Sequence, residues 1–573
     1  MDFISALDSY SKENEEKQLG QNKHFEYSWS KSDIQEQITQ FFFQLVRANS
    51  EKTDTLRMKL IEILKFLSQS EGDVNTTKYI SIIVRLLCHT RDIVGGKGEY
   101  ALSYMMLCTL YDYFPQFAIY TLEKFVLIDE KQPYGSWKDM KNIVHIVDNN
   151  SRLNHQITQK CVELVNKQLT KDLACEKDAD LSLCAKWIPR ETSKKHNWFF
   201  KMLAQDFFKE SIYMKSAKTH YSKTKSEKKC YMEYRKLISG LNRRLDTVQI
   251  KQCGNIWHEI DHNKTTSITL NKNKKAFLNV KKDGEQRSME VHRIECANNF
   301  REYIANQVKS GKEVKGKNVG LENFTKNALE IIANKEFNTV EADLLNSQWR
   351  SNSTINSSLG KMVAMVDTSG SMIGDPLNAA IALGIRVAEK SILGKRVLTF
   401  SKVPDWHNLD GTDDFVSMVK KLAKAEWTMN TNFYAAMQLI LQALITNKVP
   451  PEEASDMVLA VFSDMQIDVA DGSHSNNTMI DGIEEMYKLA GYTRPHILFW
   501  NLKSTSGFPT LSSKRGVSMM SGFSPVLLNL FCEKGMGVLE TMMPWNMMIE
   551  LLNNERYMDV DKYVNEHYSN KSS

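Results

Sequence analysis

The sequence predicts a multidomain protein in which a long α-helical repeat region is followed by a smaller α/β domain. From about residue 31 to residue 345, apolar residues recur mainly at helical spacing. After residue 361, short apolar strands alternate with helical runs, which is typical of an open α/β sheet. A chain of 573 residues with 42% hydrophobic content is long enough to bury several cores.

The helical region is expected to be a stack of helical hairpins. The segment YMEYRKLISGLNRRL places its apolar side chains on one helical face, and Ser136 with Asp139 forms a predicted capping box at a helix start. A polar segment, residues 1–30, precedes this region. Two basic stretches, 215–229 and 308–320, are predicted to be mobile, and the polar residues 346–360 are predicted to be a linker to the domain at 361–573.

The run KMVAMVDTSGSM combines a buried strand with oxygen-bearing side chains. Asp367, Ser369 and Ser371 follow the strand directly, and Asp464 follows a second apolar strand, MVLAVFS. Carboxylate and hydroxyl oxygens are the ligands that hard cations prefer, and a site with few carboxylates leaves such a cation under-neutralised. The pattern therefore predicts a site for Mg²⁺ or Mn²⁺ that accepts an acidic ligand from a partner.

This order of motifs resembles the von Willebrand factor A fold, a Rossmann-like domain with a metal-ion-dependent adhesion site (MIDAS). The resemblance implies three ligand loops: Asp367, Ser369 and Ser371 in the first, Thr431 in the second and Asp464 in the third. The second loop lacks the usual glycine pair, so Thr428 is a rival to Thr431. Two alternatives use the same residues. The turn could merely precede a helix that starts at Asp375, or Asp367 could begin a phosphatase site. Ser369, however, stands where such an enzyme needs a second acid.

Charge is unevenly distributed along the chain. The net charge is +5, with +10 in residues 1–350 and −5 in residues 351–573, and residues 186–251 hold 17 basic and 6 acidic side chains. Such a basic region attracts polyanions, and RNA is the predicted partner. The candidate nucleic-acid-binding residues are Arg91, Lys97, Arg190, Lys194, Lys195, Lys228, Lys229, Arg235, Lys236, Arg243 and Arg244. Trp187, which lies among them, is expected to be a core residue.

The glycine-rich segment RDIVGGKGE admits two interpretations. It lacks the spacing of a Walker phosphate-binding loop, and a helix precedes it. The glycines could permit a sharp turn between helices, with Arg91 and its neighbours in ion pairs. Alternatively, the backbone and Lys97 could cradle an anion.

A second resemblance covers most of the chain. RDIVGGKGE, YGSWKDM, DLSLCAKWIPR and YRKLISGLNRRLD, followed by the metal motif, resemble an uncharacterised family of plants, fungi and large DNA viruses. That family is similar in layout to the Ro ribonucleoprotein (TROVE-type) autoantigen. The resemblance implies a HEAT-like helical solenoid or ring that binds small RNAs beside a von Willebrand A domain.

Composition excludes several other classes. Nine cysteines without a C-x-x-C pair argue against zinc ribbons and disulfide frameworks. No secretory signal and no uncharged apolar run of about 18 residues is present, so a cytoplasmic protein without membrane contact is expected. No H-E-x-x-H motif or nucleophile elbow occurs. The leading hypothesis is a non-enzymatic RNA-binding scaffold. The alternatives are an adaptor whose metal site binds an acidic residue of a protein partner, and a metal-assisted hydrolase.

Overall fold

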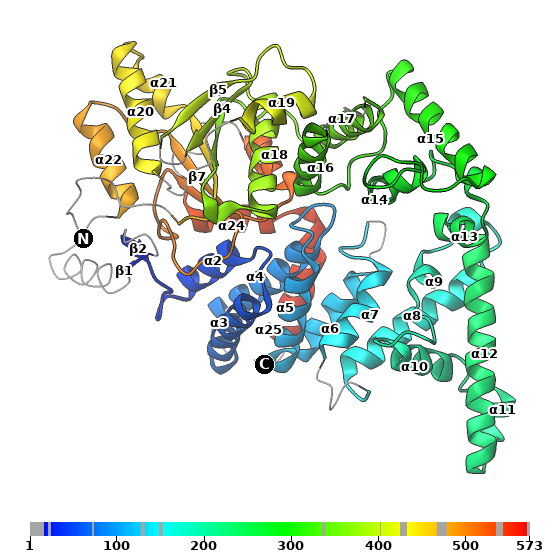
Figure 1. Ribbon diagram of the computed structural model, residues 1–573. Coiled ribbons are helices and arrows are strands. Elements are labelled where there is room, and N and C mark those ends of the chain that lie inside the picture. Colours follow the sequence, from blue (N-terminus) through cyan, green and yellow to red (C-terminus); the bar gives the residue numbers. More distant parts are fainter. Residues whose placement is uncertain are drawn as a thin grey trace.

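The computed structural model describes residues 17–20, 25–70, 74–127, 132–147, 153–334, 339–400, 403–424, 432–466, 478–534 and 542–569. Within them, a largely helical amino-terminal part is followed by a region of mixed helices and strands, as predicted (Figure 1). None of the described helices combines the length and apolar character that a membrane crossing requires. All nine cysteines lie in the described ranges and none is in a disulfide.

The larger sheet has the strand order β5-β4-β3-β6-β7-β8 and is parallel except for the pair of β4 with the edge strand β5. The runs RVLTF, MVLAVF and HILFW, predicted to be strands, lie in β4, β6 and β7. The carboxyl ends of the parallel strands therefore meet at one edge. The strands are β3 (Met362–Asp367), β4 (Arg396–Phe400), β5 (Asp405–Asn408), β6 (Val458–Ser463), β7 (His496–Asn501) and β8 (Val517–Ser521).

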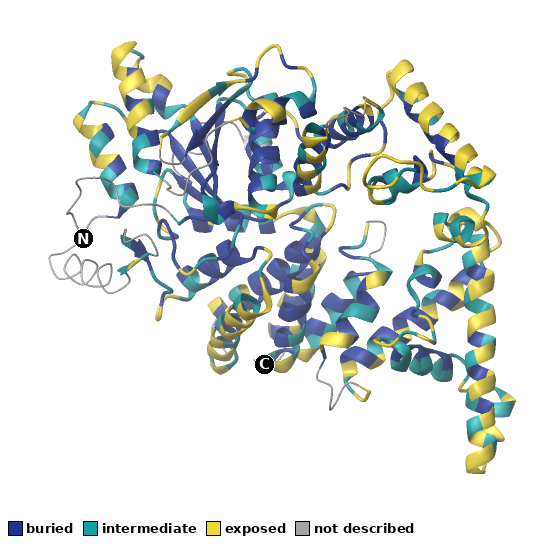
Figure 2. Cartoon of the chain, viewed as in Figure 1, coloured by how far each residue is buried: buried dark blue, intermediate teal, exposed yellow. Residues whose placement is uncertain are grey.

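Helices cover both faces of this sheet, because the side chains of each strand alternate between them. In β3, Val363 and Met365 join a core with α20 and α22, whereas Ala364 and Val366 join the core that contains α18. Gly384 lets α18 approach closely, since a Cβ there would lie 2.6 Å from Val366 Cγ2. Figure 2 shows most of the sheet and of α18 as buried, whereas the edge strand β5 is largely exposed. The helices of this part of the chain are α18 (Asp375–Lys390), α19 (Phe415–Leu422), α20 (Phe433–Thr446), α21 (Pro451–Ser455), α22 (Met479–Leu489), α23 (Asn529–Lys534), α24 (Pro544–Leu552) and α25 (Met558–Ser569).

The helical part begins after a short antiparallel pair, β1 (Lys17–Leu19) with β2 (Phe25–Tyr27). Start signals in the sequence work as predicted: Ser136 and Asp139 form the capping box of α7. The helices are α2 (Ile34–Gln44), α3 (Ser50–Gln69), α4 (Val74–Arg91), α5 (Tyr100–Tyr113), α6 (Pro115–Lys124), α7 (Trp137–Ile146), α8 (Gln156–Ala174), α9 (Cys184–Trp187), α10 (Asn197–Phe207), α11 (Ile212–Lys215), α12 (His220–Arg244), α13 (Val248–Cys253), α14 (Ser267–Phe277), α15 (Val291–Lys309), α16 (Leu321–Ala333) and α17 (Thr339–Ser353).

The predictions of mobility and of a linker need correction. Residues 220–229 form the first turns of α12, where Thr219 caps the helix. Val314, in the second basic stretch, is buried, and its N–H donates to Ser347 Oγ at 2.8 Å. Residues 346–353 of the expected linker are helical, and Trp349 stacks on Phe415 with ring centroids 4.0 Å apart. Polar composition led to these wrong predictions because several of the polar groups form hydrogen bonds inside the protein.

The carboxyl-terminal helix returns to the amino-terminal helices. α25 packs on α4, and in Figure 1 it lies among α4, α5 and α6. Tyr563 stacks on Tyr120 at 3.7 Å between ring centroids, and Arg556 Nε donates to Asp92 Oδ2 at 2.6 Å. One hydrophobic core contains residues from α2 to α8, from the sheet and from α25. The amino-terminal helices therefore need the end of the chain to complete their packing.

A smaller core under α14 and α15 contains a histidine among aromatic rings. The ring centroid of His262 lies 5.2 Å from Phe277 and 4.7 Å from Phe300, and neither ring nitrogen has a hydrogen-bond partner. Burial lowers the pKa of His262 to about 4. When the pH falls below about 6.5, His262 becomes protonated in the unfolded chain but stays neutral in the folded chain. Acidification therefore lowers the free energy of unfolding.

His262→Phe is expected to remove this part of the acid sensitivity. Between pH 7 and pH 5 the variant should lose about 2 kcal/mol less free energy of unfolding than the wild type. Urea unfolding at pH 7, 6 and 5 measures this difference. His258→Phe is the matched control, because His258 is exposed. Parallel pH profiles of His262→Phe and the wild type would contradict the prediction.

Candidate functional site

The first part of the candidate metal site is the turn that leaves β3. Asp367 ends the strand and is fully buried, and its Oδ1 accepts a hydrogen bond from the Ser369 N–H at 2.9 Å. The hydroxyls of Ser369 and Ser371 lie 3.0 Å apart. Three oxygen-bearing side chains are therefore gathered at the carboxyl end of the central strand.

The neighbouring strand β6 supplies the second part. Val366 of β3 pairs with Phe462 of β6, so the residues that follow both strands emerge side by side. Ser463 Oγ donates to Asp367 Oδ2 at 2.6 Å, and Asp464 is fully buried next to it. Asp464 Oδ1 accepts from the Gln466 N–H at 3.2 Å, while Oδ2 accepts no hydrogen bond.

The proximity of the two carboxylates changes their electrostatics. Burial, and secondly the charge of Asp464, raise the pKa of Asp367 to about 7, although the bonds from Ser463 and Ser369 oppose this. A nearby cation would relieve both effects, because it favours the ionised form of each carboxylate. Asp464 Oδ2 lacks a hydrogen bond and is therefore the atom best placed to contact such a cation.

Lysine side chains already supply positive charge at this edge. Lys503 follows β7, and its Nζ lies 3.6 Å from Asp464 Oδ2 and 2.5 Å from the Ser371 carbonyl oxygen. Lys52 of α3 donates to the Ser504 carbonyl oxygen, and burial together with the charge of Lys503 lowers the pKa of Lys52. A divalent ion would therefore compete with Lys503 for Asp464.

The donor set fits a hard divalent cation. Two carboxylates and two hydroxyls are oxygen donors of the kind that Mg²⁺ and Mn²⁺ accept, and such ions usually retain several waters. In the described part of the chain, no three His, Cys, Asp or Glu side chains come together as a metal-binding group. Thr431 and its rival Thr428 lie outside the described residues, so the second predicted loop stays a prediction.

Sequence reasoning missed Ser463 and Lys503. Ser463 stands immediately before the predicted ligand Asp464, so its place at the end of β6 was a usable signal. Lys503 follows the predicted strand HILFW, which ends at the same edge of the sheet. A lysine after the third parallel strand could thus have been recognised as a charge close to the site.

Most of the predicted RNA-binding residues lie on the surface of the region from α9 to α12. Arg244 is half-buried and pairs with Asp178 at 2.8 Å, and Arg235 pairs with Glu191 at 2.5 Å. The exposed basic residues are Arg190, Lys194, Lys195, Lys228, Lys229, Arg235, Lys236 and Arg243. The structure thus leaves a large share of this positive charge facing solvent.

Arg91 and Lys97 are not on that surface, which corrects their assignment to nucleic-acid binding. Arg91 is buried and donates three hydrogen bonds to Asp139: from Nε to Oδ2 at 2.9 Å, and from Nη2 to Oδ1 at 2.9 Å and to Oδ2 at 2.7 Å. Lys97 Nζ donates to the carbonyl oxygens of Phe42 and Leu45 and to Ser521 Oγ, at 2.9, 3.0 and 2.6 Å. The RDIVGGKGE segment is therefore an interhelical turn whose charged side chains are buried, and these charges hold neighbouring elements together.

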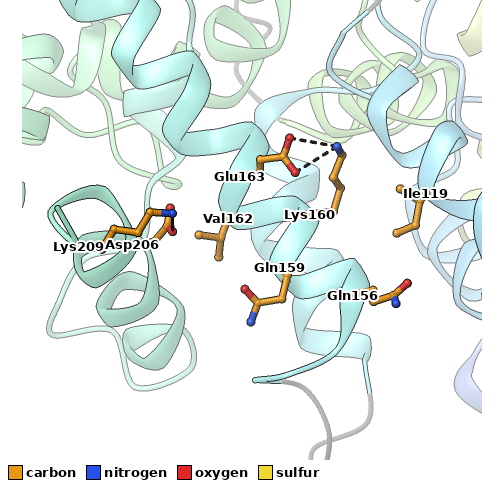
Figure 3. A pocket seen from close by; sticks show the side chains of 8 residues that line it. All are labelled: Ile119, Gln156, Gln159, Lys160, Val162, Glu163, Asp206 and Lys209. Atoms are coloured by element: carbon orange, nitrogen blue, oxygen red, sulfur yellow. Dashed lines mark hydrogen bonds and ion pairs between the residues drawn. The ribbon is translucent and has the colours of Figure 1, made fainter.

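A pocket of about 410 Å³ lies between α6, α8 and α10 (Figure 3). Its charged side chains are neutralised within the chain: Lys160 pairs with Glu163 at 3.1 Å and with Glu123 at 2.6 Å, and Lys209 pairs with Asp206 at 2.9 Å. It contains no nucleophile or buried unpaired charge, so it adds nothing to the candidate chemistry. The lining residues are Ile119, Gln156, Gln159, Lys160, Val162, Glu163, Asp206 and Lys209.

Comparisons with known proteins match both parts of the fold. A family described as "Domain of unknown function (DUF2828)" matches residues 156–356, which run from α8 to the end of α17. A second, "Domain of unknown function (DUF7788)", matches residues 361–566, which hold the sheet and the candidate metal site. An uncharacterised protein of Acanthamoeba polyphaga mimivirus is 28% identical over 490 residues, covering 82% of this chain and 79% of that protein. The chain is thus similar to domains and to a viral protein that carry no assigned activity.

Proposed function

We propose that the protein is a non-enzymatic RNA-binding scaffold. A helical-repeat region of the HEAT-like type would carry the RNA, and a von Willebrand factor A-like domain would carry Mg²⁺ or Mn²⁺. The parallel sheet with ligand-type oxygens at its carboxyl edge supports the second assignment. The layout agrees with the arrangement of helices and sheet implied by the Ro-type resemblance.

The observation that carries the proposal is unneutralised positive charge on the α9–α12 surface. Six of the exposed candidate side chains there form no ion pair with any described residue: Arg190, Lys194, Lys195, Lys228, Lys229 and Arg243. Lys229 lies with its Nζ 4.4 Å from the Tyr213 ring centroid, so an aromatic ring accompanies the charge. Surface positive charge without internal partners is what a phosphate backbone binds.

Replacing Lys228, Lys229, Arg235 and Lys236 together by Gln should lower the affinity for RNA at least about tenfold in 100 mM KCl. The logarithmic salt slope should fall by about 0.7 for each single-strand phosphate that the variant no longer binds. Arg235 and Lys236 belong to exposed ion pairs, which stabilise folding little, so the melting temperature should barely change. Filter binding over a KCl series measures affinity and slope.

The matched control removes the same number of exposed basic side chains from the sheet region, at Lys420, Lys421, Lys448 and Lys488. This control should leave RNA binding close to that of the wild type. Equal losses in both variants would mean that total charge, and not the α9–α12 surface, determines binding. If the wild-type chain does not bind RNA at low salt, the proposal is wrong.

A second candidate is an adaptor that binds an acidic protein residue through the metal. It is favoured by Asp464 Oδ2, which has no hydrogen bond, and by Ile373, a residue that is 74% exposed and follows Ser371 by two positions. Capture of proteins by the full chain, after nuclease treatment and with either Mg²⁺ or EDTA, distinguishes the candidates. Capture that needs Mg²⁺ but no RNA supports the adaptor. RNA binding unchanged by EDTA supports the scaffold.

A further inference from the structure

Three lysine side chains converge on one tryptophan in the helical part. The Nζ atoms of Lys138, Lys141 and Lys186 lie 5.7, 4.9 and 5.8 Å from the centroid of the Trp187 ring. Lys138 and Lys141 stand on α7, whereas Lys186 and Trp187 belong to α9, which contacts α7. Trp187 is half-buried and not part of the core, which corrects its expected place.

No carboxylate neutralises this cluster within the described residues, since none of its three lysines forms an ion pair there. Burial and the charge of Lys138 lower the pKa of Lys141, and burial lowers the pKa of Lys186. Cation–π contacts with Trp187 offset only part of the repulsion that Lys138 exerts on Lys141. An anion placed beside these ammonium groups would oppose that repulsion and the cost of burying Lys141 and Lys186.

A second aromatic ring extends the cluster toward solvent. Lys138 Nζ also lies 5.7 Å from the centroid of the Tyr100 ring, and the Tyr100 residue is 55% exposed. Tyr100 begins α5 directly after the RDIVGGKGE turn. The same ammonium group therefore connects a half-buried indole with an exposed phenol ring.

The elements that carry the cluster are held firmly in place. The Glu99 N–H donates to the Thr90 carbonyl oxygen at 2.8 Å, which fixes the turn before Tyr100. Asp139, at the start of α7, accepts from Arg91 and from the Ser136 N–H, so α7 is tied to the end of α4. The aromatic and cationic groups are thus presented on a prearranged surface.

We propose that the Trp187 cluster, defined as Tyr100, Lys138, Lys141, Lys186 and Trp187, binds single-stranded RNA. A phosphodiester lies among the three lysines and an unpaired base stacks on Tyr100. This inference rests on the proposed RNA-binding function and names a site that is separate from the basic face of α12. Ammonium groups attract a phosphodiester, which carries one negative charge, and an exposed aromatic face accepts any unpaired base. An acidic peptide would use the lysines but not the ring.

The test uses the full chain and two probes of equal length, a fluorescein-labelled oligouridylate and an RNA duplex, in fluorescence anisotropy. The triple replacement by Gln of Lys138, Lys141 and Lys186 should weaken the binding of both probes. It should also reduce the logarithmic salt slope by about 0.7 or more. Tyr100→Leu should weaken the oligouridylate about fivefold or more, leaving duplex binding and the salt slope as in the wild type.

The α12 variant distinguishes the proposed RNA-binding function from the proposed site at the Trp187 cluster. It replaces Lys228, Lys229, Arg235 and Lys236 by Gln. If it loses RNA affinity while the Trp187 cluster variants with wild-type melting temperatures do not, the inference is overturned and the proposed function stands. If no variant and no wild-type chain binds RNA, both fail. A further outcome would also overturn the inference. In it, polyglutamate binding depends on the three lysines but not on Tyr100, and replacing the lysines leaves RNA binding unchanged.

Discussion

Asp367→Asn is expected to abolish divalent-metal binding and, without metal, to stabilise the folded protein at neutral pH. Asp367 is fully buried, and burial with the charge of Asp464 raises its pKa to about 7. A carboxylate whose pKa is raised on folding reduces stability as the pH rises from about 4 to about 7. A displacement from 3.8 to about 7 corresponds to at most about 4 kcal/mol, which the neutral amide should partly recover.

The effect of metal should differ between the two proteins. Mg²⁺ should raise the melting temperature of the wild type, because the ion binds only the folded site. It should not change the melting temperature of Asp367→Asn, which should already melt higher than the wild type in EDTA. Thermal unfolding in EDTA and in MgCl₂, with titration calorimetry for Mg²⁺ and Mn²⁺, measures both effects.

Asp375→Asn is the matched control, since Asp375 is an exposed acid at the start of α18 close to the same turn. It should bind metal like the wild type and show the same response to Mg²⁺. Metal binding that persists unchanged in Asp367→Asn would support the simpler interpretation that the turn only begins a helix. If the wild type binds neither Mg²⁺ nor Mn²⁺, the proposed metal site is wrong.

The edge of the sheet was predictable because short-range patterns determine it. An apolar run followed by D-x-S-x-S, and a second run followed by Ser463 and Asp464, predict parallel strands whose ends meet. The convergence of these side chains then follows from the sheet alone. The proximity of Lys503 and Lys52 was not predictable in this way, because it depends on how β7 and α3 approach the same edge.

Charged residues in the helical part show that a charged side chain cannot be assigned to the surface from sequence alone. Lys97 is one positive residue in a glycine-rich segment, and its hydrogen-bond acceptors lie at the end of α2 and in β8, more than 50 residues away on each side. Likewise, polar composition predicted a linker at 346–360, but Trp349 and Asn352 are buried. Composition gives no information on a partner that is distant in the sequence.

The cluster around Trp187 illustrates the same limit for aromatic residues. The apolar neighbours of Trp187 predicted a core position, and two of its lysines belong to α7, 46 and 49 residues earlier in the sequence. Only the packing of α7 against α9 brings them together. The candidate sites were therefore predictable where one strand and its loop supply the groups, and not where separate helices do.

Arg91→Met is expected to reduce the free energy of unfolding by about 3–5 kcal/mol. The side chains of Arg91 and Asp139 are only 6% and 2% exposed, and Asp139 also accepts hydrogen bonds from Tyr104 Oη at 2.5 Å and the Ser136 N–H at 2.8 Å. Removal of the guanidinium leaves a buried carboxylate without its counter-charge. Gly135 packs so closely that a Cβ there would lie 2.1 Å from Asp139 Oδ2, so the gap cannot be filled from that side.

Lys65→Met provides the control, because it makes a similar change at an exposed position of α3 and should alter stability by less than about 0.5 kcal/mol. Adding Asp139→Asn to Arg91→Met should recover part of the loss, since the unpaired charge is then removed. Urea unfolding followed by circular dichroism measures all four proteins. If Arg91 instead bound phosphate at the surface, Arg91→Met would leave the unfolding midpoint unchanged and weaken RNA binding. That outcome would reverse the assignment of Arg91 as an internal ion-pair partner that joins α4 to the start of α7.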